Sequence, residues 1–323
     1  MRVLVTGGAG FIGSHVVDEL LRREHTVVVY DNLSTGFKEH LAEGMRSGQL
    51  TLIQNDILHT GALARAMDGV ETVFHLAANA DVRGGQRNTA IDMEQNVVGT
   101  RSVLEAMKTV GANQIIFTSS ATVYGEPTQF PTPETYAPLQ TSLYGASKLA
   151  AEAMIQAYGE YFGIRSFAFR FVSWIGERYS HGVVFDFMNK LREDSERLEI
   201  LGDGNQKKSY LHVHDGIRGI FTAMDRMQDL KNVVNLGHLE VVDVNFVARL
   251  VCEEMGLKNV SFHYSGGARG WLGDSPLVQL DISRLQRVGF VPEISIEEGI
   301  RRTVRYLLSH PWLLEARSPV RVA

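Results

Sequence analysis

A tyrosine and a lysine stand four residues apart in the segment YGASK, as Tyr144 and Lys148. We predict a helix over residues 144–162, so both side chains lie on one face of that helix. A free phenol has a pKa of about 10, too high for a base at neutral pH, and a nearby ammonium favours the phenolate. The pair can therefore work as a general base with an electrostatic partner. Taken alone, the same spacing is also typical of a solvated helix edge.

Two serines, Ser119 and Ser120, follow the apolar run QIIFT at residues 114–118. Such a run is typical of a buried strand. At the end of that strand a small hydroxyl can share a substrate proton with the Tyr144 phenol. Serines at a strand end are otherwise caps or turn formers. We predict that Ser120 assists Tyr144 and that both serines contact the substrate.

Three evenly spaced glycines, Gly7, Gly10 and Gly13, stand between an apolar stretch at residues 3–6 and an amphipathic pattern. They therefore lie in a strand-to-helix turn. There, missing side chains let backbone N–H groups approach an anion, and the helix dipole favours negative charge. One glycine would suffice for a tight turn, so three favour dinucleotide binding. The spacing is not the commoner G-x-G-x-x-G, and the glycines alone do not decide the family.

An acidic residue, Asp31, ends the next apolar stretch at residues 26–30. A carboxylate there can accept hydrogen bonds from the adenosine ribose and would repel a 2′-phosphate, so we predict NAD rather than NADP. The segment DNLSTG is also typical of a turn. Asp56, after residues 51–54, either caps the next turn or approaches the adenine.

Alternating strand and helix patterns must position these residues. We predict strands at residues 3–6, 26–30, 51–54, 72–76, 114–118 and 166–171, with a long helix at residues 89–110. This alternation is typical of an α/β fold with a Rossmann-type doubly wound parallel sheet, which binds its ligand at the carboxyl ends of the strands.

The alternation of strand and helix patterns becomes less regular after residue 171. Polar, glycine-containing stretches at residues 178–182, 202–208 and 265–276 indicate loops, and residues 183–191 and 244–254 indicate helices. We predict an NAD-binding domain over residues 1–171 with further elements near 211–240. A smaller, interleaved α/β substrate-binding portion takes residues 172–210 and 241–323.

The composition limits the function classes. The chain has 323 residues, 44% of them hydrophobic and 21% charged, as in ordinary globular proteins. A net charge of −5 gives no support for a nucleic-acid or membrane-surface partner. A single cysteine, Cys252, excludes an internal disulfide and a Cys-rich metal site. With neither a signal-peptide pattern nor a membrane-spanning stretch, we expect a cytoplasmic protein without a metal.

Six segments together resemble the extended short-chain dehydrogenase/reductase family, in its branch of UDP-glucose and UDP-glucuronate 4-epimerases. They are TGGAGFIGSH, DNLSTG, FHLAA, SSATVYGE, YGASK and GDGNQKKSYLHVHD. The resemblance implies NAD, a UDP-sugar substrate, and a homodimer through a four-helix bundle, here residues 89–110 and 144–162. It also implies a set of cofactor contacts. These are Gly7, Gly10, Phe11, Ile12 and Gly13 at the pyrophosphate, Asp31, Asn32 and Ser34 near the adenosine ribose, Asp56 and Ile57 at the adenine, Ala77 and Asn96 along the cofactor, and Lys148 on the nicotinamide ribose.

The residues after Ser120 separate reaction types within this superfamily. Sugar 4,6-dehydratases resemble one another in an Asp–Glu pair there, whereas this chain continues with Ala121 and Thr122. Without a carboxylate to act at C5 and C6, oxidation and reduction at C4 are favoured over dehydration. Tyr144 would then remove the O4 proton while Lys148 holds the phenolate. The alternatives are another 4-keto nucleotide-sugar enzyme, such as a dehydratase or decarboxylase, and a non-catalytic NAD-sensing regulator.

The substrate contacts depart in part from the family pattern. Ser173 replaces an asparagine, and Lys208 replaces an arginine, so a bidentate phosphate clamp becomes a point charge. Arg269 matches a phosphate-binding arginine of the family. Arg178 and Arg192 can bind the C6 carboxylate of a hexuronate, which a neutral hexose does not need. Equally, both can be solvated, with Arg192 serving its helix C-terminus. The sequence leaves hexose and hexuronate open.

Overall fold

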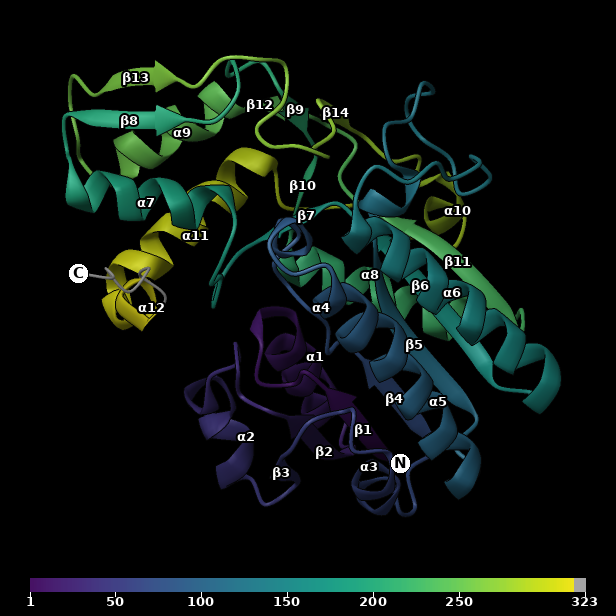
Figure 1. Ribbon diagram of the computed structural model, residues 1–323. Helices are drawn as coiled ribbons and strands as arrows, with labels where there is room; N and C mark the ends of the chain where they lie inside the picture. The colour runs from purple at the N-terminus through teal and green to yellow at the C-terminus, as the bar shows by residue number, and fades with distance from the viewer. Residues whose placement is uncertain (317–323) are drawn as a thin grey trace.

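The computed structural model describes residues 1–316, which are built around a seven-stranded parallel sheet (Figure 1). The strand order is β11-β6-β5-β4-β1-β2-β3. The strands are β1 (Arg2–Thr6), β2 (Thr26–Asp31), β3 (Leu50–Gln54), β4 (Thr72–His75), β5 (Gln114–Ser120), β6 (Arg165–Phe171) and β11 (Lys231–Leu236). All six predicted strands are present, and the predicted Rossmann-type α/β fold is confirmed. Residues 317–323, the end of the predicted substrate-binding portion, lie outside the described residues.

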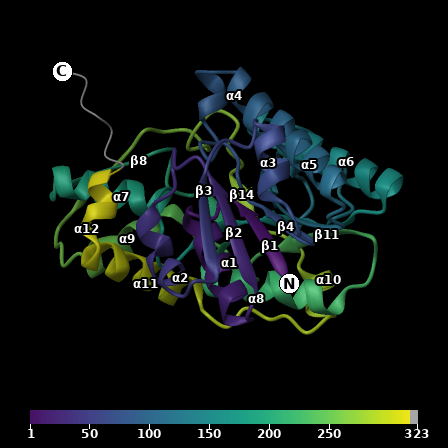
Figure 2. The same cartoon turned by 90° about the horizontal axis from the view of Figure 1, so that it is seen from below.

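Helices cover both faces of this sheet, which explains why its strands are continuous apolar runs. Val3 and Val29 face the core cluster that includes α1 (Phe11–Arg22) and α8 (Val213–Arg226). Leu4 and Val28 face the second cluster, with α3 (Thr60–Ala66), α5 (Gly99–Val110) and α6 (Leu143–Phe162). Figure 2 shows α3, α5 and α6 on one side of the sheet and α8 on the other.

The helix predicted over residues 89–110 is helical but not α-helical throughout. It begins as α4 (Ala90–Asp92), passes through a π-helical segment (Met93–Val98) and continues as α5. The predicted long helix is therefore present, and its first part includes a π-helical segment. A π-helical turn holds one residue more than an α-turn and is frequent at functional sites. Here it contains the buried Asn96.

Short sheets form the rest of the molecule. They are β7 (Ser173–Ile175) with β10 (Tyr210–His212), β8 (Arg197–Ile200) with β13 (Ser261–Tyr264), and β9 (Lys207–Lys208) between β12 (Val242–Asp243) and β14 (Leu277–Val278). The loop predicted at residues 202–208 is thus wrong at its end, because β9 pairs with chain segments far away in sequence.

The remaining helices complete the molecule. They are α2 (Ala42–Arg46), α7 (Val183–Glu193), α9 (Val244–Glu254), α10 (Ser283–Gln286), α11 (Ile296–Ser309) and α12 (Pro311–Ala316). Figure 1 shows α7 and α9 beside β8 and β13, beyond one end of the main sheet. None of the helices within residues 1–316 is long and apolar enough to cross a membrane.

Candidate active site

A cavity of about 280 Å³ opens where β5 and β6 end. By the elements they come from, we divide the lining residues into a sheet wall, with Ser120 of β5 and Tyr144 of α6, and an opposite wall, with Ser173 of β7, Lys208 of β9 and the later Trp271. The carboxyl ends of the strands are the place where doubly wound sheets bind their ligands. Residues predicted for catalysis and residues predicted to bind the substrate therefore line the same cavity.

The three glycines of the turn between β1 and α1 have different roles. Gly7 has a φ of +70°, and a Cβ there would lie 2.7 Å from the backbone nitrogen of Ala77. A Cβ at Gly13 would lie 2.1 Å from the Gly7 oxygen. A Cβ at Gly10 would meet only that same oxygen, at 3.3 Å. Gly7 and Gly13 are thus needed for packing, and Gly10 borders open space.

This open side of the turn suits an anion. Gly10 is the N-cap of α1, and no described side chain caps the first turn that begins at Phe11. The N–H groups at this end are left to a ligand, and the helix dipole adds a positive potential. The pyrophosphate of a dinucleotide fits these requirements.

Acidic and amide side chains gather next to the turn, at the ends of β2 and β3. Asp31 accepts hydrogen bonds from the backbone nitrogens of Ala9 (2.9 Å) and Leu33 (2.8 Å). Burial raises the pKa of Asp31, and these two N–H groups oppose the rise. Asn32 donates to the Asp56 carboxylate at 2.9 Å. The structure thus brings together the residues predicted for the adenosine end.

The other predicted cofactor contacts lie at the same end of the sheet. Ala77 lies two residues after β4, and its N–H donates to Thr6 Oγ1 at 3.2 Å. Asn96 reaches the same loop, since its Oδ1 accepts from the Asn79 nitrogen at 2.8 Å. The remaining members of the set are Phe11 and Ile12, which line the cavity, and Ser34 and Ile57, which follow β2 and β3.

The predicted catalytic residues come from the start of α6 and the end of β5. Lys148 donates from Nζ to the Thr118 carbonyl at 2.9 Å, and this Nζ lies 5.8 Å from the centroid of the Tyr144 ring. Ser120 accepts hydrogen bonds from Thr122 N (3.2 Å) and Thr122 Oγ1 (2.9 Å). Its own hydroxyl proton can therefore point to an acceptor in the cavity.

Electrostatics in the protein alone do not lower the phenol pKa. Burial, with a contribution from the Asp92 carboxylate, raises the pKa of Tyr144 well above its ordinary value. Burial also lowers the pKa of Lys148 to about 8. The lowering of the Tyr144 pKa that the sequence suggested therefore depends on the positive charge of a bound nicotinamide.

A buried ion pair lies behind the catalytic residues, and sequence reasoning missed it. The Ser119 hydroxyl donates to Glu152, which is paired with Arg170 at 2.7 Å. Glu152 stands four residues after Lys148, so its place on the catalytic face of α6 was a usable signal. Although Ser119 borders the cavity, its proton is directed to Glu152, whereas that of Ser120 is not.

The two predicted diphosphate contacts are paired with carboxylates. Lys208 lines the cavity and lies 2.5 Å from Asp274. Arg269 is paired with Glu126 and is not among the residues that line the cavity. Asp274 and Arg269 both belong to segment 265–276, so the two pairs connect this segment to β9 and to Glu126.

Two predicted substrate contacts do not reach the cavity. Arg178 pairs with Asp18 of α1 at 2.7 Å, and Arg192 pairs with Glu315 of α12 at 3.4 Å. Neither side chain lines the cavity. The structure therefore does not support their prediction as sugar contacts, because each is drawn to a carboxylate elsewhere on the molecule.

Comparison with known proteins identifies the family of this chain. The profile of the NAD-dependent epimerase/dehydratase family matches residues 3–237. The chain belongs to this family. The predicted resemblance and the predicted NAD cofactor are thereby confirmed, and the glycine turn supplies the cradle that NAD needs.

Members of the family with several activities are similar to the chain. A putative UDP-glucose 4-epimerase of Methanocaldococcus jannaschii is 32% identical, over 94% of this chain and 98% of that protein. UDP-glucuronic acid decarboxylase 1 of Xenopus tropicalis is 29% identical, over 94% of this chain and 72% of the decarboxylase.

Similar solved structures include two epimerases and a dehydratase. A UDP-glucose 4-epimerase of Thermotoga maritima with UDP-glucose has a TM-score of 0.87 at 32% identity, covering 96% of this chain and 100% of the other. A Bacillus cereus UDP-glucuronic acid 4-epimerase with UDP-glucuronic acid and NAD has 0.88 at 26%, with the same coverage. A dTDP-glucose 4,6-dehydratase of Streptomyces venezuelae has 0.88 at 26%, covering 97% and 98%.

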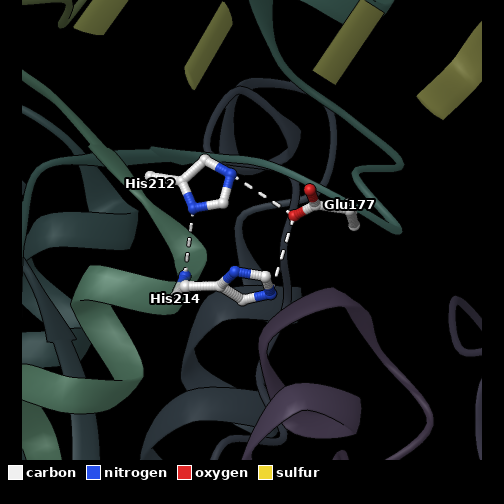
Figure 3. Close-up of side chains that lie close together, drawn as sticks. All are labelled: Glu177, His212 and His214. Carbon is white, nitrogen blue, oxygen red and sulfur yellow. Dashed lines mark hydrogen bonds and ion pairs between the residues drawn. The ribbon is translucent and has the colours of Figure 1, made fainter. Parts of the chain in front are cut away.

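Three further titratable side chains converge outside the cavity (Figure 3). Glu177 Oε2 lies 3.3 Å from His212 Nε2 and 3.7 Å from His214 Nε2. The Nδ1 atom of His212 faces the backbone N–H of His214, and the Nδ1 atom of His214 faces the Arg302 guanidinium. Because both Nδ1 atoms face donors, the Nε2 atoms carry the protons and direct them to Glu177. A metal would need lone pairs at those atoms, so we interpret this cluster as an electrostatic contact of Glu177 with the two histidines and Arg302.

The charge on Glu177 follows from the same contacts. Burial raises the pKa of Glu177, but hydrogen bonds from His212 and Arg302 outweigh burial and hold this pKa well below its ordinary value. Arg302 Nη2 lies 2.6 Å from Glu177 Oε1. The cluster thus joins α11 to the start of α8 and to the loop after β7.

Proposed function

We propose that the protein is a UDP-sugar 4-epimerase, which inverts C4 through a transient 4-keto sugar. The observation that carries this proposal is the placement of Tyr144 and Ser120 on one cavity wall, with Lys148 one helical turn behind. Among the cavity-lining residues that the structure describes, Asp274 is the one carboxylate, and it is paired with Lys208. Dehydration needs an acid and a base at C5 and C6, so this lining favours epimerisation.

The residues have distinct roles in this reaction. NAD held at the glycine turn and Asp31 would supply the redox chemistry, as acceptor and then donor of the C4 hydride. Tyr144 removes the proton from O4 and later returns it. Ser120 donates a hydrogen bond to the same oxygen, and the Lys148 ammonium stabilises the phenolate. Holding these groups at one wall turns proton transfer into a positioned step.

The substrate contacts follow from the opposite wall. Relatives with this fold are crystallised with UDP-glucose or UDP-glucuronic acid. We assign the diphosphate to Lys208 and Arg269, which must exchange their carboxylate partners for phosphate oxygens. Ser173 lines the same wall and is assigned to the substrate.

The charge of the cavity favours a neutral sugar. Lys208 and His181 are the basic residues among its described lining, and Lys208 is paired with Asp274. Arg178 and Arg192, the predicted partners of a C6 carboxylate, are bound to acids elsewhere. We therefore propose UDP-glucose and UDP-galactose as the preferred pair over their hexuronate counterparts.

A homodimer is part of the proposal. Large apolar side chains are exposed along the two helices predicted to form a four-helix bundle. They are Met93 and Val98 in the first helix and Tyr161 and Phe162 in the second. Sedimentation of the purified protein measures this directly, and a monomer at micromolar concentration would contradict it.

The function is tested by incubating the NAD-loaded protein with UDP-glucose, UDP-galactose and both hexuronates, and resolving the products by C4 configuration. We expect interconversion of C4 epimers without net formation of NADH. Release of carbon dioxide from UDP-glucuronate would indicate a decarboxylase, and a 4-keto-6-deoxy product a dehydratase. NAD binding without turnover of any sugar would indicate a regulator.

A further inference from the structure

A buried carboxylate close to the catalytic pair has no described role. Asp92, the last residue of α4, is 1% exposed. Its Oδ1 accepts hydrogen bonds from Asn79 Nδ2 (2.9 Å) and Asn96 Nδ2 (3.4 Å). Its Oδ2 is buried without a hydrogen-bond partner among the described residues. A buried charge with an unpaired oxygen is costly, so its retention calls for an explanation.

A chain of hydrogen bonds connects this carboxylate to the catalytic helix. Asn96 Nδ2 also donates to Ser147 Oγ at 2.8 Å. Ser147 Oγ in turn donates to the Tyr144 carbonyl at 2.7 Å. The π-helical turn places Asn96 between Asp92 and α6, so the network fixes the first turn of α6 against the segment before α5.

The charge of Asp92 is not neutralised by a direct partner. No described lysine, arginine or histidine forms an ion pair with it. By contrast, Glu152, the other buried carboxylate near Lys148, is paired with Arg170 at 2.7 Å. The groups that face Lys148 electrostatically are therefore Asp92 from α4, Glu152 from α6 itself and His75 from β4. Asp92 is the one that also acts on Tyr144.

We propose that Asp92 is a positioning residue of the active site, which holds the first turn of α6 through Asn96 and Ser147 and supplies negative charge near the buried ammonium of Lys148. The proposal rests on the function proposed above, in which Tyr144 works as a phenolate and Lys148 as an ammonium. The Asp92 charge keeps the proton on both side chains. It preserves the ammonium of Lys148 against burial, and it retards the release of the Tyr144 proton.

The charge of Asp92 determines the direction of the expected pH effect. Asp92→Asn removes the negative charge and lowers the pKa of both Tyr144 and Lys148. Tyr144 must lose its proton for activity and Lys148 must keep its own. Both limbs of the profile of kcat/KM against pH therefore move to lower pH, each by about one unit. On the acidic limb the variant is about tenfold faster than the wild type, and on the alkaline limb about tenfold slower.

Two matched variants separate charge from position. Glu94→Gln removes an exposed carboxylate two residues away, and it leaves both limbs in place. Ser147→Ala keeps the charge but breaks the link to Tyr144, so it lowers kcat by about fivefold without moving either limb. If Asp92→Asn is insoluble, Asp92→Ser removes the charge without an amide group near Gly85 and carries the same expectation.

A second measurement does not depend on sugar turnover. The phenolate absorbance of the NAD-loaded protein is titrated in Asp92→Asn and in the unsubstituted protein, with Tyr144→Phe as the blank. We expect the Tyr144 titration to move to lower pH by about one unit in the variant. An unchanged titration overturns the proposal for Asp92 even where no sugar is epimerised. Absence of epimerisation in the unsubstituted protein overturns the proposed function and leaves this titration as the test of Asp92.

Discussion

The two walls of the cavity are built differently. On the wall formed by the main sheet, Ser120 ends a seven-residue strand and Tyr144 begins a twenty-residue helix. On the opposite wall, Lys208 belongs to a two-residue strand, and Trp271 belongs to an irregular segment. Long regular elements hold proton transfer to narrow geometry, whereas short ones allow a substrate to displace existing contacts.

The cations of the two regions also differ in how firmly their partners hold them. Lys148 is buried and donates to a backbone carbonyl of β5, which cannot move away. Lys208 on the opposite wall, and Arg269 outside the cavity lining, are paired with side-chain carboxylates, which can rotate when a phosphate binds. We infer that the sheet wall determines the reaction and that the opposite wall determines affinity for the nucleotide sugar.

The largest expected effect is on the sheet wall. Tyr144→Phe removes the proton acceptor and leaves the ring, so turnover falls by at least the 10²–10⁴-fold that general-base catalysis contributes. NAD and UDP-sugar affinity are expected to change little, which titration calorimetry can measure. Tyr161→Phe, an exposed tyrosine on the same helix, serves as the control. Near-normal turnover in Tyr144→Phe would contradict the role of Tyr144 as the base. It would also contradict the inference that the sheet wall determines the reaction.

The glycine turn between β1 and α1 offers a second contrast, between its own glycines. Gly10→Ala should fold normally, because the added Cβ meets a single atom at 3.3 Å, but it should bind NAD about tenfold more weakly by crowding the cradle. Gly13→Ala should instead lower the free energy of unfolding by about 1–3 kcal/mol, since its Cβ lies 2.1 Å from the Gly7 oxygen. Thermal unfolding and NAD titration separate the two. Equal loss of NAD affinity and stability in both variants would contradict this division.

The sheet wall and the neighbouring glycine turn were the parts that could be predicted from sequence. Gly7, Gly10, Gly13 and Asp31 lie within one strand–helix–strand unit, so local spacing fixes their positions. Tyr144 and Lys148 share one helix face for the same reason. Local patterns suffice wherever the neighbours in space are also neighbours in sequence.

The parts that sequence reasoning missed depend on distant partners. Asn96 and Ser147 are 51 positions apart, and only the fold reveals their hydrogen bond. The short strand β9 exists because β14 and β12 flank it. Arg178 and Arg192 were assigned by charge alone, and charge does not give the direction of a long side chain. Each found an acidic partner on a helix that the sequence did not place beside it.

On the opposite wall, substitutions should alter binding rather than chemistry. Lys208→Met removes a cation of the proposed diphosphate site, so KM for UDP-glucose should rise about tenfold while kcat is nearly constant. Glu126→Gln frees Arg269 from its carboxylate partner and should lower KM. Steady-state kinetics test both. If kcat of Lys208→Met fell as much as kcat/KM, Lys208 would interact with the substrate only in the transition state. That result would contradict the contrast between a wall for chemistry and a wall for binding.

The smallest expected effect concerns the two arginines outside the cavity. Arg192→Ala loses a pair with Glu315 at 3.4 Å on the surface, and such pairs contribute about 0–1 kcal/mol. Arg178→Ala loses a pair with Asp18 that lies between α1 and the loop after β7, again without touching the cavity. The ratio of kcat/KM for UDP-glucose to that for UDP-glucuronate should therefore be unchanged in both variants. A charge-assisted hydrogen bond to a C6 carboxylate would contribute about 1.5–3 kcal/mol, or roughly ten- to a hundredfold in this ratio. A shift of that size in either variant would show that the arginine leaves its acidic partner for the sugar, and hexuronates would then replace neutral hexoses as the preferred substrates.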